Sequence, residues 1–216
     1  MSVILEWLGH CAFRLSANGG PRILIDPYDD SIGYKMPDYG CDILLISHSH
    51  YDTSGVQHVP GKYSLIDSRG TTQVGDYTFK SYHGWHDKNN GRDFGECLIF
   101  SFHLDGLHWV YFSHIGDVPR DWILEELRPI DVAFIPVGGV FAMGPLEAKF
   151  LVDRISPRLV VPMHFDTKSL NFTLLPLVEF RKTMGEVWEV DDWKVSIDGA
   201  QIGSGPILLQ MKYWMG

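Results

Sequence analysis

A group of metal-binding side chains follows a run of branched aliphatic residues near position 45. Residues 43–46 are typical of a buried strand, and His48, His50 and Asp52 follow them at alternate positions. Alternate residues of an extended segment project to one side, so these three side chains can aim at one point. Imidazole and carboxylate suit zinc and related ions. The spacing therefore predicts a metal site at the end of this strand.

Further ligand-type residues follow other apolar strands. His83 and His86 come after residues 77–82. His114 and Asp117 follow residues 107–112, and His164 follows residues 159–161. Loops at strand ends on a rigid scaffold commonly carry functional sites. His103 and His108 instead fall in the middle of strands, and we interpret them as structural.

Composition excludes several classes of protein. The chain has 216 residues, of which 45% are hydrophobic and 21% charged, as in an ordinary soluble globular protein. A net charge of −9 argues against a nucleic-acid partner. There is no apolar run of membrane-spanning length and no signal-peptide pattern. Three separated cysteines, Cys11, Cys41 and Cys97, suit buried reduced thiols, so we expect a cytoplasmic protein.

Strands dominate the first half of the chain, and helices alternate with strands in the second. We expect helices over residues 119–128, 145–155 and 174–184, with Pro176 in the first turn of the last one. Helices must then cover sheets, which predicts a layered α/β sandwich. No linker or repeat divides the chain, so residues 1–216 are expected to form one domain. The aromatic-rich tail, residues 186–216, is a candidate surface for contact between copies in a homo-oligomer.

Several motifs resemble one known family. The order His48-x-His50-x-Asp52, then a His, Gly116-Asp117 and His164 resembles the metallo-β-lactamase superfamily, in particular its predicted zinc-dependent hydrolases that are similar to ascorbate-6-phosphate lactonase. The further matching motifs are Trp7-Leu8-Gly9-His10, Ile23-Leu24-Ile25-Asp26-Pro27, Ile135-Pro136-Val137-Gly138-Gly139 and Val160-Val161-Pro162-Met163-His164-Phe165. The resemblance covers about residues 3–185. It implies a four-layer αββα sandwich with the site along one edge of the packed sheets.

The resemblance also implies a set of ligands. His48, His50 and His86 would hold the first metal, Asp52 and His164 the second, and Asp117 would bridge the two. We prefer His86 to His83 because His86-Asp87, followed by Gly91, is similar to the His-Asp-x-x-x-Gly loop of this branch. Asp52 and Asp117 are the residues expected to act in catalysis.

Thr53 departs from the family pattern, which usually reads His-x-His-x-Asp-His. Threonine is a poor zinc ligand, so the second metal loses one of its usual protein ligands. The alternatives are a weak or empty second site, a substitute such as His83, His10 or His114, or extra waters on a harder metal such as Mn²⁺. His10 and His114 are also candidates for a supporting role beside the ligands.

The predicted function is metal-dependent hydrolysis with one or two Zn²⁺ ions, Mn²⁺ or iron being alternatives. A metal lowers the pKa of bound water to about 7, so the resulting hydroxide would attack a small ester, lactone, amide or phosphodiester. Asp52 would orient this nucleophile. The rival enzyme class is the flavodiiron type of redox chemistry, but no flavin-binding motif is present. The rival without activity is a degenerate metal-binding or scaffold protein, motivated by Thr53.

Overall fold

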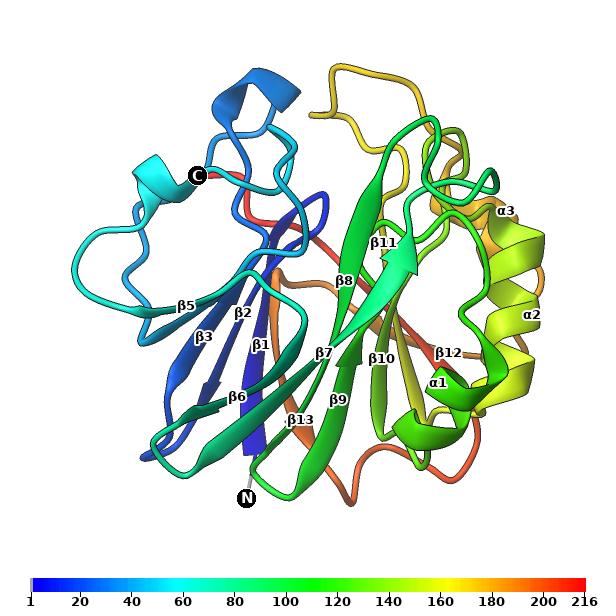
Figure 1. The fold of residues 1–216 in the computed structure, drawn as a ribbon. Helices are drawn as coiled ribbons and strands as arrows, with labels where there is room; N and C mark the ends of the chain where they lie inside the picture. The colour runs from blue at the N-terminus through cyan, green and yellow to red at the C-terminus, as the bar shows by residue number, and fades with distance from the viewer. Residues whose placement is uncertain (1) are drawn as a thin grey trace.

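Two β-sheets pack face to face in the computed structural model, which describes residues 2–216 (Figure 1). The first sheet has six strands in the order β13-β1-β2-β3-β4-β5, and the second has eight in the order β12-β14-β11-β10-β9-β8-β7-β6. The strands of the first sheet are β1 (Ser2–Gly9), β2 (Ala12–Ala17), β3 (Arg22–Ile25), β4 (Ile43–Leu45), β5 (Ser64–Ile66) and β13 (Lys194–Asp198). Those of the second are β6 (Gly70–Val74), β7 (Tyr77–Trp85), β8 (Glu96–Leu104), β9 (Leu107–Tyr111), β10 (Val132–Pro136), β11 (Leu159–Met163), β12 (Glu186–Val190) and β14 (Ile207–Met211).

Three α-helices lie on the outer side of the second sheet, α1 (Asp121–Leu127), α2 (Pro145–Ile155) and α3 (Leu177–Arg181) (Figure 1). Helix α2 begins at Pro145, whose missing N–H costs nothing in a first turn. Its buried residues, Ala148, Leu151, Val152 and Ile155, lie three or four positions apart and therefore on one face. Parallel strands β9, β10 and β11 thus have both faces covered, which explains their continuous apolar runs.

Side-chain alternation divides the first sheet between two cores. Ile23 and Ile25 of β3 face the second sheet, whereas Leu24 between them belongs to a smaller cluster on the outer face. That outer cluster contains Tyr28 and Tyr34 from the loop after β3, and Trp214 of the C-terminal tail packs against it. Two 3₁₀ turns, at residues 30–32 and 56–58, are the helical elements on this side. The αββα class is confirmed, with one helical layer reduced to these turns and loops.

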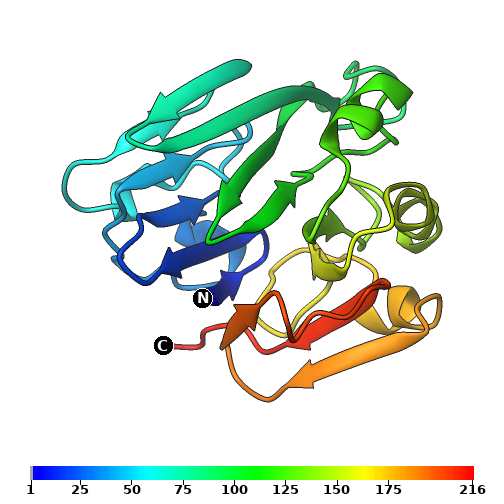
Figure 2. The same ribbon diagram turned by 90° about the horizontal axis from the view of Figure 1, so that it is seen from below.

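The tail completes both sheets. Strand β13 pairs with β1 at the edge of the first sheet, while β12 and β14 extend the second beyond β11. Figure 2 shows these orange and red strands closing the sandwich on one side. Tyr213 makes an edge-to-face contact with Trp7, with ring centroids 5.6 Å apart. The tail aromatics are therefore used for packing within the chain.

The third helix is shorter than predicted. Leu174 and Leu175 precede it and are not helical, and the Leu175 N–H donates to the Gly138 carbonyl oxygen at 2.8 Å. Pro176 is the residue before the helix rather than part of its first turn. A backbone hydrogen bond to a neighbouring loop has therefore replaced the first turn that the pattern predicts.

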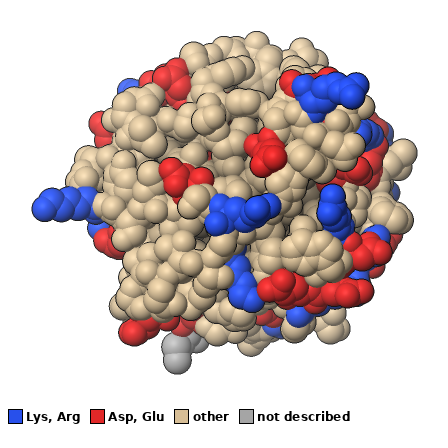
Figure 3. Space-filling model, in the orientation of Figure 1, with Lys and Arg blue, Asp and Glu red and all other residues tan. Residues whose placement is uncertain are grey.

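Charged side chains of both signs are interspersed on the face shown in Figure 3, without an extended basic surface. Within residues 2–216, no helix combines the length and the apolar character needed to cross a membrane.

Candidate metal centre

Two adjacent groups of ligand-type side chains lie at one end of the sandwich, where the loops gather at the top of Figure 1. The first group is His48, His50 and His86, and the second group is His10, Asp52, His114 and His164. Within each group, one potential ligand atom per residue lies within 4.8 Å of the others. Every member follows the end of a strand or occupies the loop beyond it. The sheets thus bring together residues that are far apart in sequence.

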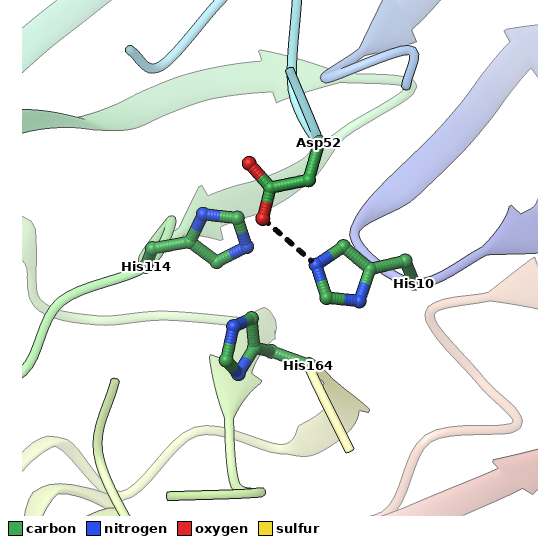
Figure 4. Close-up of side chains that lie close together, drawn as sticks. All are labelled: His10, Asp52, His114 and His164. Atoms are coloured by element: carbon green, nitrogen blue, oxygen red, sulfur yellow. Dashed lines mark hydrogen bonds and ion pairs between the residues drawn. The ribbon is translucent and has the colours of Figure 1, made fainter. Parts of the chain in front are cut away.

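The side chains of the second group are buried, and two of them, Asp52 and His164, also line a cavity. Figure 4 shows its four side chains converging from separate segments. His10 Nε2 lies 3.3 Å from Asp52 Oδ2. The His164 ring is 4.8 Å from the His10 ring and 4.5 Å from the His114 ring, measured between centroids. Three imidazoles and one carboxylate therefore surround a common space.

The two groups are in contact. His48 Nε2 of the first group lies 3.1 Å from His114 Nδ1 of the second. His48 also lies close to the other members of its own group, with ring centroids 4.5 Å from His50 and 4.8 Å from His86. The seven side chains therefore form one continuous polar centre.

Burial keeps several of these imidazoles neutral. It lowers the pKa of His48 to about 3, with His86 adding to the effect. Burial also lowers the pKa values of His86, His114 and His164. Neutral imidazole is the form that binds a metal. These four histidines are therefore ready to act as ligands at neutral pH.

Asp52 remains ionised despite its burial. Burial alone would raise the pKa of its carboxyl, but the hydrogen bond and charge of His10, with contributions from His48 and His164, hold that pKa below its ordinary value. A carboxylate among imidazoles completes a donor set of the type found in zinc and iron sites.

Unpaired buried atoms test whether a metal fits here. Among residues 2–216, seven buried side-chain N or O atoms lack a hydrogen-bond partner, and four of them belong to the two groups. These four are His10 Nδ1, Asp52 Oδ1, His86 Nδ1 and His164 Nδ1. A buried polar atom without a partner is costly, so such a concentration has to be compensated. The residues fit bound metal ions.

The buried carboxylate of Asp26 positions His48 through Ser47. Asp26 accepts hydrogen bonds from the Ser47 N–H at 2.7 Å, the Ser47 hydroxyl at 2.6 Å and the Tyr111 hydroxyl at 2.7 Å. Ser47 Oγ in turn lies 2.9 Å from His48 Nδ1. Burial raises the pKa of Asp26 to about 7, although these hydrogen bonds oppose the rise. Partners of this kind fix the ring orientation of a metal ligand.

The loop after His86 is organised by its neighbour Asp87. The Asp87 carboxylate accepts four backbone N–H groups, from Asn89, Gly91, Asp93 and Phe94, at 2.7–3.0 Å. The His-Asp-x-x-x-Gly pattern is thus a loop closed around one carboxylate.

Close backbone contacts and strain accompany the site. A Cβ atom at Gly116 would lie 2.6 Å from the His86 carbonyl oxygen, and one at Gly138 would lie 2.2 Å from that of His164. Only glycine permits these approaches. His10 and His164 have φ angles of 48° and 52°, in the left-handed region that such residues seldom adopt. Strain of this kind gathers at functional sites, where the surrounding structure enforces it.

The structure places most of the predicted ligands together. His48, His50, His86, Asp52 and His164 all belong to the two groups. Residues 49–53 form bends and turns rather than an extended segment, so Asp52 joins the second group instead of pointing with His48 and His50.

Asp117 and His83 lie elsewhere. The Asp117 side chain is exposed, accepts the Val118 N–H at 2.8 Å and lines a separate hollow that also contains His83. His83 Nε2 lies 3.4 Å from Glu96 Oε1. The expected bridging position of Asp117 does not match this geometry, since His114, three residues earlier at the strand exit, fills the place inside the centre. Nor is His83 placed as a substitute ligand.

Thr53 has a structural use. Its side chain is buried, and its hydroxyl donates to the carbonyl oxygens of His48 at 2.9 Å and His50 at 3.3 Å. It therefore holds the ligand-bearing turn closed. His10, among the substitutes considered from the sequence, occupies the second group beside Asp52.

Some residues of the site had no role in the sequence-based prediction. Asp26 appeared there only as part of a motif, although a carboxylate directly after an aliphatic strand was a usable signal. Phe94 and Phe172 contact the centre, with ring centroids 5.6 Å from His86 and 5.6 Å from His10, respectively. No sequence pattern distinguishes such loop aromatics from core residues.

Known proteins are similar to this chain in sequence and in fold. The model of the beta-lactamase superfamily domain matches residues 4–164. A UPF0173 metal-dependent hydrolase of Thermococcus onnurineus is 32% identical over 223 residues, covering 87% of this chain and 95% of that one. A second, from Pyrococcus furiosus, is 30% identical and covers 85% and 93%. A solved structure from Thermotoga maritima, assigned to the metallo-beta-lactamase superfamily, has a TM-score of 0.80 at 28% identity, covering 97% of this chain and all of that one.

The chain belongs to the metallo-β-lactamase superfamily and, within it, to the UPF0173 family.

Proposed function

We propose that this protein is a binuclear, zinc-dependent hydrolase of a small-molecule substrate. The observation that carries the proposal is the pair of adjoining ligand groups with four unpaired buried atoms. The relatives from T. onnurineus and P. furiosus are described as metal-dependent hydrolases, which supports the reaction type. Imidazole-rich donor sets favour zinc, while one carboxylate keeps iron and manganese as alternatives.

In the proposed centre, His48, His50 and His86 would hold one ion, and His10, Asp52, His114 and His164 would hold the other. His10 and His114 supply the second ion with imidazoles that the resemblance does not assign to it. Bound metal supplies Lewis acidity and lowers the pKa of water at this position. Asp117, which is exposed and outside both groups, is not one of the proposed ligands.

The protein's own residues orient the reacting groups. Asp52 is held by His10 through one carboxylate oxygen, and its second oxygen is buried without a hydrogen-bond partner. This carboxylate is the base we propose for accepting a proton from the attacking water and passing it to the leaving group. Tyr111, Asp26 and Ser47 fix His48 in one orientation.

The bond attacked is a carbonyl ester or lactone in our proposal, with amides and phosphodiesters as less favoured alternatives. The proposal keeps the reaction of the lactonase-like proteins that the sequence resembles, but not their phosphorylated substrate. The alternative of an inactive scaffold is disfavoured because decay would not leave unpaired imidazole and carboxylate atoms buried together.

Hydrolysis by the zinc-loaded protein provides the test. We expect turnover of lactones or simple esters that is abolished by chelation and by Asp52→Asn, with Asp117→Asn as the matched control that remains active. Protein that holds two ions per chain and hydrolyses none of lactones, esters, amides or phosphodiesters would overturn the proposed function.

A further inference from the structure

An aromatic cavity opens directly onto the metal centre. It has a volume of about 250 Å³ and is lined by His50, Tyr51, Asp52, His86, Phe94, Phe141, His164 and Phe172. Four of these residues are members of the two ligand groups, so one wall of the cavity is the candidate centre itself. The other four are aromatic.

Three phenylalanines from separate loops form the cavity's apolar wall. Phe94 and Phe141 are in edge-to-face contact, with ring centroids 5.7 Å apart, and Phe141 and Phe172 are related in the same way at 6.0 Å. Phe94 and Phe141 are each 38% exposed. Side chains of this size normally bury their surface, and here they leave part of it facing the cavity beside buried ligands.

A second cavity extends from the same centre. It has a volume of about 450 Å³ and shares His48, His50 and Phe94 with the site, while Asp67 and Glu96 contribute carboxylates to its wall. Glu96 is paired with His83 at 3.4 Å, whereas Asp67 is exposed. In the part of the chain that the structure describes, neither cavity is lined by Lys or Arg.

These surfaces discriminate by polarity and charge. An aromatic wall gains free energy by removing apolar ligand surface from water. In these two cavities, an anionic group remote from the reacting bond would meet carboxylates and no basic side chain. Lys88 lines an adjoining hollow that shares Phe94 and Phe141, and there it is paired with Glu147. Bound metal ions would attract an anionic group most strongly where it contacts them, and less with increasing distance.

We infer that the aromatic cavity receives a flat, uncharged apolar group attached to the hydrolysed bond, so that the substrates are neutral or cationic aryl or cyclic compounds rather than phosphorylated ones. This inference rests on the proposed function and names its substrate class. Phe94, Phe141 and Phe172 are then the residues that determine specificity.

Binding of hydroxamates to the zinc-loaded protein separates the inference from turnover, because a hydroxamate binds zinc without being hydrolysed. The probes are acetohydroxamate, phenylacetohydroxamate and 4-sulfophenylacetohydroxamate, measured by isothermal titration calorimetry. We expect the phenyl compound to bind about tenfold or more tightly than the acetyl compound. The sulfonate should remove most of that gain.

Phe141→Ala and Phe94→Ala should reduce the ratio of phenylacetohydroxamate affinity to acetohydroxamate affinity to about threefold or less. Phe150→Ala is the matched control, because Phe150 is 54% exposed on helix α2 and does not line either cavity. Both target side chains are partly exposed, and circular dichroism verifies that the variants fold.

Equal affinity for the acetyl and phenyl probes, or tighter binding of the sulfonate, would overturn the inference while leaving the proposed hydrolase intact. A phenyl preference in protein that hydrolyses nothing would overturn the proposed reaction but not the pocket's selectivity. Protein that takes up no metal would bind none of the probes through zinc, and both proposals would fail together.

Discussion

Histidines gather at two places in this molecule, and their surroundings differ. At the candidate centre, His10, His86 and His164 each have a buried Nδ1 without a partner. On the outer face of β8 and β9, His103 and His108 stack with ring centroids 4.5 Å apart. There His108 has partners for both ring nitrogens, Pro129 O at 2.6 Å and Ser101 Oγ at 2.8 Å.

The difference separates two uses of the same side chain. A buried imidazole whose two nitrogens both bond to groups outside the ligand clusters is complete as a structural element. His48 and His114 differ from it, because His48 Nε2 and His114 Nδ1 face each other, 3.1 Å apart, inside the candidate centre. A buried imidazole with an unpaired nitrogen beside other ligand-type groups requires a bonding partner, such as a metal ion, that the chain itself does not supply. Burial alone does not distinguish them, because it lowers the pKa of both His86 and His108.

Exchanging these histidines for alanine should give opposite results. We expect His86→Ala to lose about one metal ion per chain with little change in the stability of the metal-free protein. His108→Ala should retain the metal and lose about 1–3 kcal/mol of unfolding free energy, because Ser101 and the Pro129 carbonyl lose a partner. Metal analysis and urea unfolding of both variants measure the two effects. Loss of metal in His108→Ala would remove the distinction.

Acid should weaken the metal-free protein through the ligands. His48 has a pKa of about 3 when folded, against an ordinary value of 6.5, so between these pH values the unfolded chain binds a proton that the folded chain does not. The free energy of unfolding should therefore fall as the pH drops below about 6.5, by up to about 1.4 kcal/mol per pH unit for this one group. Urea unfolding at several pH values measures the slope, and His48→Asn should flatten it. An unchanged slope in His48→Asn would contradict this assignment.

Thr53→Val tests whether the departure from the family pattern is structural. The substitution removes two hydrogen bonds to the carbonyl oxygens of His48 and His50. We expect a loss of about 1–3 kcal/mol in unfolding free energy and weaker metal binding, since the turn that carries both ligands loosens. Thr53→Ser is the control that keeps the hydroxyl. Equal stability of the valine and serine variants would show that these bonds matter little.

The smallest effect is expected far from the centre. Arg22 donates to both oxygens of Asp42, at 2.9 and 3.0 Å, and its hydrogen bonds lower the pKa of Asp42 to about 2. Stability from this exposed pair is present above pH 4 and is lost as the pH falls toward 2. Asp42→Asn should cost at most about 1 kcal/mol at pH 7 and leave metal content unchanged. A thermal melt and metal analysis check both statements.

Much of the fold could be predicted from the sequence because its signals are local. Residues 43–46 and 132–137 are apolar runs, and Asp105-Gly106 marks the hairpin between β8 and β9. The shortening of α3 could not be predicted, since the hydrogen bond of Leu175 to Gly138 joins segments that are distant in the chain.

The part of the candidate site that could be predicted from the sequence consists of ligands that directly follow the ends of strands. His48, His50, His86 and His164 are placed together as expected. Choosing His114 over Asp117 was beyond the sequence, because both follow β9 and only the path of the loop decides which side chain turns inward. His10 reaches Asp52 by a left-handed backbone conformation that no residue pattern indicates.

Metal content per chain tests the binuclear centre most directly. Protein purified without chelator or affinity metal, then analysed by plasma mass spectrometry, should contain close to two ions per chain. His114→Ala should contain about one ion, and Asp117→Ala should match the unmodified protein. Two ions in His114→Ala together with a loss in Asp117→Ala would contradict the ligand set proposed here.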